Sequence, residues 1–150
     1  EPNLGKISYF KVISGELTAN TELRNTQTGQ IEKLHQLFIV DGKNRQPIEK
    51  LTAGDIGATL KLKDTFTNQT LCEVKENIIL SPIQFPEPRI RMAVVAASKQ
   101  DDDKIGEVLQ KIQAEDPTLR SYFSNELKQL IIEAQGEQHL AVCKWYMEHV

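Results

Sequence analysis

A cluster of three prolines within seven residues, Pro82, Pro86 and Pro88, divides this chain of 150 residues into two parts. Proline fixes φ and has no amide hydrogen to donate, so neither a helix nor a central strand is expected to run through residues 81–88. The hydrophobic pattern also changes there, from short strand-like runs to alternating strand and helix patterns. The sequence therefore predicts two small domains, residues 1–84 and residues 85–150.

The first domain is expected to consist of short β-strands. Its clearest strand-like runs are residues 6–12, 54–60 and 70–74. Turn signals that contain glycine separate such runs, at Ser14-Gly15, Thr28-Gly29 and Asp41-Gly42. Many short strands at close spacing, with no helical pattern among them, favour a closed or nearly closed barrel over a sandwich, because closure removes exposed sheet edges.

The second domain is expected to have an α+β fold. Strand patterns occupy residues 90–96, 119–123 and 130–134. Ser98 is a candidate N-cap for a helix that Pro117 ends, and Gly136 opens a second helical segment. The order strand, helix, strand, strand, helix lacks the last strand of a ferredoxin-like domain, so we predict a C-terminally truncated ferredoxin-like fold.

Composition and charge argue against some classes of protein. The formal net charge is −3, which does not indicate a nucleic-acid-binding protein, although a local basic surface needs only a few residues. No apolar run long enough for a membrane span and no signal peptide is present, so we expect a cytoplasmic protein.

Cys72 and Cys143 form no CxxC pair, and both are expected to be reduced and buried. The chain starts without methionine, and its last residues lie within an apolar periodic segment, so we expect a fragment of a longer protein.

Several residues have the chemistry of a site, but each has a simpler structural interpretation. His139 and Cys143 are four residues apart, yet two ligands do not complete a zinc site, so packing and capping roles are favoured. The three aspartates at 101–103 are favoured as a helix N-terminus rather than a magnesium site. Glu115 and Asp116 are adjacent like an acid/base pair, but they are expected to close the helix and lead into the next strand. We therefore predict no metal site.

No catalytic motif stands out either. The sequence contains no Gly-x-Ser-x-Gly nucleophile motif and no Gly-x-x-x-x-Gly-Lys-Ser/Thr phosphate loop. Trp145 and Tyr146 are adjacent aromatic residues near the end of a helical segment, which is more typical of a core or docking surface than of base stacking. The sequence thus predicts a chain with no catalytic residues and no bound cofactor of its own.

Several linked motifs resemble the elongation factor G family of translational GTPases. In the first domain they are Gly54-Asp55-Ile56, Leu62-Lys63-Asp64-Thr65 and Thr70-Leu71-Cys72, which are similar to the family's domain II. In the second domain they are Phe85-Pro86-Glu87-Pro88, Glu115-Asp116-Pro117-Thr118-Leu119 and Gly136-Glu137-Gln138-His139-Leu140, which are similar to domain III. The resemblance spans nearly the whole chain in the family's order, and it implies a translation-factor-type β-barrel followed by a ferredoxin-like domain.

The chain also departs from the family's usual pattern. The family usually has Gly-Asp where this chain has Asn68-Gln69, Pro-Lys where it has Ala96-Ala97, and Leu where it has Gln138. These changes leave the fold prediction unaltered. They leave open whether the parent is the translocation factor itself or a divergent paralogue, including the similar ribosome-protection proteins of tetracycline resistance. Without the resemblance, a freestanding protein-interaction barrel would remain an equal alternative.

The resemblance implies a role in ribosomal translocation during protein synthesis. The parent protein is expected to bind GTP and Mg²⁺ in an N-terminal GTPase domain that these residues do not include. The implied partners are small-subunit ribosomal RNA and protein, together with the GTPase domain and the C-terminal domains of the same parent chain.

One hairpin is a candidate ribosome contact. The Asp41-Gly42 turn signal is followed by Lys43, Asn44 and Arg45, which would present two cations and an amide at an exposed tip. A phosphate backbone could reach these groups without burying them. A solvated turn is the alternative interpretation.

Overall fold

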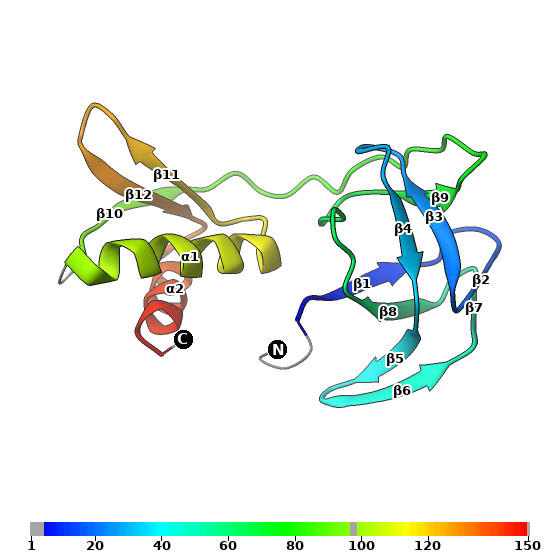
Figure 1. Ribbon diagram of the computed structural model, residues 1–150. Coiled ribbons are helices and arrows are strands. Elements are labelled where there is room, and N and C mark those ends of the chain that lie inside the picture. The colour runs from blue at the N-terminus through cyan, green and yellow to red at the C-terminus, as the bar shows by residue number, and fades with distance from the viewer. Residues whose placement is uncertain (1–4, 97–98, 150) are drawn as a thin grey trace. The chain divides into compact units, whose positions relative to one another are not determined.

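The computed structural model describes residues 5–96 and 99–149, with side chains described for all of these except residues 99–103 (Figure 1). The chain divides into two compact units, Glu1–Pro82 and Ile83–Val150. Neither helix in the described part of the chain has the length and apolar character needed to cross a bilayer.

The first unit consists of strands joined by tight turns. Its strands are β1 (Ile7–Lys11), β2 (Glu16–Thr18), β3 (Thr21–Asn25), β4 (Ile31–Leu34), β5 (Leu37–Asp41), β6 (Asn44–Ile48), β7 (Lys50–Thr52), β8 (Ile56–Leu60) and β9 (Leu71–Glu73). The turn glycines predicted from sequence, Gly15, Gly29 and Gly42, all have positive φ. This left-handed backbone is one that glycine adopts without steric cost, which explains why the strands break at these points.

The strands of the first unit pair into separate antiparallel sheets. The largest has the order β1-β8-β5-β6, a second has the order β4-β3-β9, and β2 pairs with β7. In the described residues no ladder links these sheets into one closed ring, so the barrel closure favoured by the sequence is not observed. Strands β2, β7 and β9 are only three residues long, which leaves little backbone for pairing on both sides.

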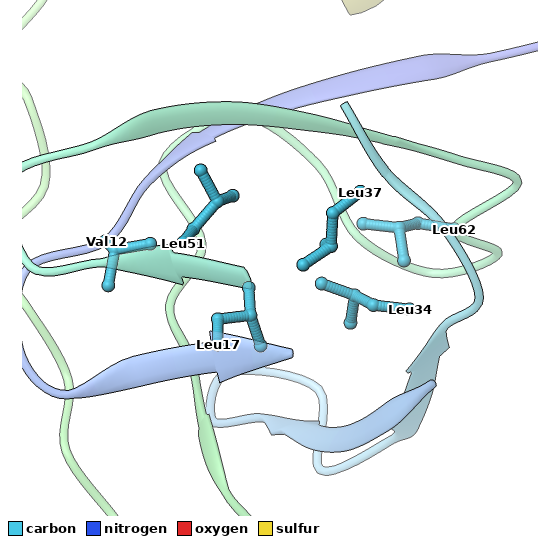
Figure 2. Close-up of a cluster of buried hydrophobic side chains, with 6 residues drawn as sticks. All are labelled: Val12, Leu17, Leu34, Leu37, Leu51 and Leu62. Atoms are coloured by element: carbon cyan, nitrogen blue, oxygen red, sulfur yellow. The ribbon is translucent and has the colours of Figure 1, made fainter. Parts of the chain in front are cut away.

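Buried leucines hold these sheets together. Leu34, Leu37 and Leu51 are at most 1% exposed. They form one cluster with three further residues, Val12, Leu17 and Leu62, and Figure 2 shows the six side chains gathered between the strands. Fully burying a leucine stabilises the folded state by about 1.5–3 kcal/mol, so side-chain packing joins sheets that the backbone leaves separate.

The second unit has the order of elements predicted from sequence. It contains β10 (Ile90–Val94), α1 (Lys99–Glu115), β11 (Arg120–Ser124), β12 (Gln129–Ala134) and α2 (Glu137–His149). The strands form an antiparallel sheet in the order β10-β12-β11. The predicted cap at Ser98 and the side chains of the three aspartates at 101–103 lie outside the described residues.

Both helices of this unit contribute to one core. Leu109 of α1 and Cys143 of α2 are each 1% exposed, and they pack with Ile132 and Ala134 of β12. Cys143 is therefore buried, as predicted. The same prediction is wrong for Cys72, which is only half-buried because β9 lies at the edge of its sheet; its Sγ lies 3.2 Å from the carbonyl oxygen of Glu76.

Candidate functional site

The predicted contact residues lie on the β5–β6 hairpin. Gly42 has a φ of 57° and forms the two-residue turn with Lys43, and Asp41 pairs with Asn44 beside it. Lys43 and Asn44 are exposed, whereas Arg45 is half-buried on β6 opposite Val40. Lys43 is thus the exposed cation at the tip of the hairpin, and Arg45 lies beyond the tip on β6.

A buried carboxylate anchors the loop between β8 and β9. Glu32 is 5% exposed, and its Oε1 accepts hydrogen bonds from the amide of Asp64 at 2.8 Å and from Oγ1 of Thr65 at 3.0 Å. Its Oε2 accepts a third from the amide of Lys63 at 3.2 Å. Burial raises the pKa of Glu32, but these hydrogen bonds and the charge of Lys6 together lower it by more, so the net pKa lies below its ordinary value.

Asn25 fixes the other end of the same loop. Its side chain is fully buried, and Nδ2 donates to Oε1 of Gln69 at 2.8 Å. That oxygen also accepts the amide of Phe66 at 2.8 Å. Oδ1 of Asn25 accepts the amides of Gln27 and Thr28, which form the preceding turn. Asn25 therefore connects two turns of the first unit through hydrogen bonds.

Asn68 and Gln69 are two departures that this loop explains. Asn68 has a φ of 71°, in the left-handed region, where asparagine is tolerated better than most residues other than glycine. Gln69 supplies a side-chain oxygen acceptor for Asn25 and Phe66. Both residues therefore suit the loop conformation that the structure shows.

The roles of Glu32 and Asn25 in this region were not predicted from the sequence. A signal was present, because Glu32 is in phase with the buried Leu34 on β4, while Ile31 and Lys33 are exposed. A carboxylate on the apolar face of a strand is costly to bury unless it is hydrogen-bonded, so its position indicates built-in partners.

Asp116 ends α1 in the way that the sequence predicted. Its amide donates to the carbonyl of Ile112 at 2.7 Å, and its Oδ1 accepts from both the amide and the hydroxyl of Thr118, at 2.8 and 2.6 Å. Burial raises the pKa of Asp116, but these bonds and the nearby His139 lower it more, giving a net decrease. The carboxylate is therefore charged at neutral pH.

His139 links α2 to the end of α1. Its Nδ1 accepts the amide of Gln135 at 3.3 Å, and its Nε2 lies 3.1 Å from Oδ2 of Asp116. Both ring nitrogens are thus engaged, and neither serves as a base for Cys143. Burial raises the pKa of the Cys143 thiol, and the negative charge of Asp116 adds to this, so the thiol is not an activated nucleophile. Among residues 5–96 and 104–149, no group of three or more possible ligands is placed to hold a metal ion.

Trp145 and Tyr146 lie on the surface of α2. They are 53% and 39% exposed, with ring centroids 5.4 Å apart in an edge-to-face arrangement. The Trp145 ring also stacks on His149, at 4.7 Å between centroids. Of the two roles favoured from sequence, core and docking surface, their exposure is inconsistent with a core role.

Two family models match the chain in consecutive order. Residues 1–74 match elongation factor G domain 2, and residues 85–149 match elongation factor G domain III. The chain belongs to the elongation factor G family. The parts of elongation factor G that are matched are these two domains, which do not include the GTPase domain.

A solved structure has the same fold. A crystal structure of a protein from Thermus thermophilus matches 99% of the chain with a TM-score of 0.85 and 24% sequence identity. The chain spans 22% of the length of that protein. The sequence motifs that resemble elongation factor G lie within the two matched domains. Glu32 accepts hydrogen bonds from residues 63–65 of these motifs.

Proposed function

We propose that this chain is the central module of an elongation factor G-like translational GTPase that acts in ribosomal translocation. The observation that carries the proposal is the succession of domain 2 and domain III matches, which together span residues 1–74 and 85–149. We propose that the first unit is a translation-factor-type β-barrel and the second a ferredoxin-like domain. The sheet order β10-β12-β11 supports the second assignment, because it is the order of the first three strands of that fold.

The module contacts the ribosome and couples domains rather than catalysing a reaction. In this proposal GTP and Mg²⁺ bind to the GTPase domain of the parent protein in the cytoplasm. The first unit contacts small-subunit ribosomal RNA and protein, and both units contact the GTPase domain and the C-terminal domains of the parent. Two compact units joined by a proline-rich segment support this role, because such units can move as rigid bodies.

The chain alone is expected to bind neither GTP nor GDP specifically. The physical reason is that its sequence has no phosphate loop, whose backbone amides and lysine would hold the nucleotide phosphates. Isothermal titration calorimetry with GTP and GDP in the presence of Mg²⁺ measures this. Saturable binding with a dissociation constant of about 1 μM, equivalent to about −8 kcal/mol, would refute it.

We predict that Lys43 and Arg45 of the hairpin contact ribosomal phosphates. Replacing both by alanine in the full-length parent should weaken association with small subunits and reduce the salt dependence by about one unit of slope per lost phosphate contact. Co-sedimentation with purified small subunits across a potassium chloride series measures both quantities. Lys33→Ala, at an exposed position on β4, is the matched control. An unchanged slope, with the fold intact by circular dichroism, would identify the tip as a solvated turn.

A ribosome-protection protein of tetracycline resistance is the alternative parent. The departures at Asn68, Gln69 and Gln138 are compatible with a divergent paralogue. A protection protein would restore translation in the presence of tetracycline without replacing the translocation factor, so a translation assay with and without the drug separates the two parents.

A further inference from the structure

A groove between the end of α1 and the middle of α2 is not used by the proposed function. It has a volume of about 180 Å³, and its lining residues are Ile112, Glu115, Asp116, His139, Val142, Cys143 and Tyr146. Pockets for small molecules usually measure about 300–1,000 Å³, so this groove is of a size for one side chain rather than for a nucleotide.

One end of the groove is negatively charged. Glu115 is exposed, and no hydrogen bond or ion pair engages its carboxylate within the described residues. Asp116 beside it is also ionised, and its side chain is 40% exposed. The last turn of α1 contains no basic residue, so the negative end of the helix dipole adds to these charges.

The walls of the groove are apolar and aromatic. Ile112 comes from α1, while Val142 and Tyr146 come from α2 and are 45% and 39% exposed. Exposed Trp145 lies beside this surface, because its ring is in edge-to-face contact with the ring of Tyr146. Lysine and arginine side chains pack their aliphatic stems on such surfaces and direct the charged group toward carboxylates or aromatic rings.

We propose that this groove binds a lysine or arginine side chain of a protein partner, with its cation at Glu115 and its stem against Ile112, Val142 and Tyr146. Charge complementarity selects this occupant, since the carboxylates would repel the phosphates of RNA. The site already holds His139 against Asp116, which keeps the Asp116 carboxylate in place. The proposal does not depend on the parent's action on the ribosome.

The probe for this site is a blocked tripeptide of leucine, arginine and leucine, titrated into the chain and followed by NMR. We expect saturable shifts of the Val142 and Tyr146 amides and of the Trp145 indole, with a dissociation constant of about 1 mM because one side chain is bound. Glu115→Gln should weaken binding about three- to fivefold, as for loss of a partly exposed ion pair. Glu107→Gln, at an exposed position on the same helix, is the matched control and should leave binding unchanged.

The same peptide with glutamine in place of arginine should not produce saturable shifts. Equal binding of the glutamine peptide would show that the surface is merely apolar and would overturn the proposal. So would shifts confined to other regions, no shifts at all, or an unchanged dissociation constant in Glu115→Gln. All of these outcomes leave the ribosomal role to be judged by its own experiments.

Discussion

Replacing Glu32 by alanine should lower the free energy of unfolding of the first unit by about 2–4 kcal/mol, because the donors that lose this carboxylate are left unsatisfied and one buried unsatisfied donor costs about 1–3 kcal/mol. The carboxylate oxygens that this substitution removes accept hydrogen bonds from the amides of Lys63 and Asp64 and from the hydroxyl of Thr65. Hydrogen exchange of the β3 and β4 amides in the intact chain measures the effect on this unit. Glu22→Ala, on the exposed face of β3, should change stability by at most about 0.5 kcal/mol.

The contribution of Glu32 to the stability of the first unit should also depend on pH. Because the pKa of Glu32 is lower in the folded state than its ordinary value of 4.5, its ionised form stabilises the fold. This contribution is present at neutral pH and above about pH 4.5, and it is lost as the pH falls through the folded-state pKa. The stability difference between the natural chain and Glu32→Gln should therefore be constant from pH 7 to about pH 5 and shrink below that. A difference that grew on acidification would contradict this account of the carboxylate.

Replacing Leu109 by alanine should destabilise the second unit by about 2–5 kcal/mol, the range for a buried leucine that leaves a cavity. Leu109 is 1% exposed within the core that joins α1, α2 and the sheet. Trp145 is the chain's single tryptophan and lies in this unit, so its fluorescence in a urea titration reports the unfolding of this unit.

The matched control for Leu109 is Leu127→Ala, which makes the same chemical change at a residue that is 61% exposed. Its effect should stay within about 0.5 kcal/mol. If both variants lowered the urea midpoint equally, Leu109 would not be the core residue that the packing indicates.

The order of strands and helices could be predicted because it depends on local patterns. The alternation in residues 90–94 and the stop at Pro117 are properties of short segments, and the corresponding elements β10 and α1 are present. The turn glycines, such as Gly15 and Gly42, likewise require only local backbone geometry. These features do not depend on distant parts of the chain.

Long-range relations could not be predicted in the same way. Closure of a barrel depends on which strands pair across the unit, and the observed ladders remain in separate sheets. Cys72 was predicted to be buried from its residue type, but the edge position of β9 exposes it partly. The partners of Glu32 lie more than 30 residues away, so the sequence shows a carboxylate on an apolar face but not what it binds.

The local structure of the candidate hairpin could be predicted in part. The turn signal correctly located the hairpin and its exposed Lys43. The half-buried position of Arg45 depends on its pairing with Val40 across the hairpin, which the turn signal alone does not specify. Contact of this hairpin with ribosomal phosphate stays a prediction.

We propose that this module belongs to a GTPase that acts on the ribosome. The most direct measurement is GTP hydrolysis by the complete gene product, with and without purified ribosomes, together with a translocation assay. We predict that ribosomes stimulate hydrolysis strongly and that the gene product moves tRNA and mRNA through the ribosome. A gene product whose GTP hydrolysis is absent or unaffected by ribosomes would contradict the claim.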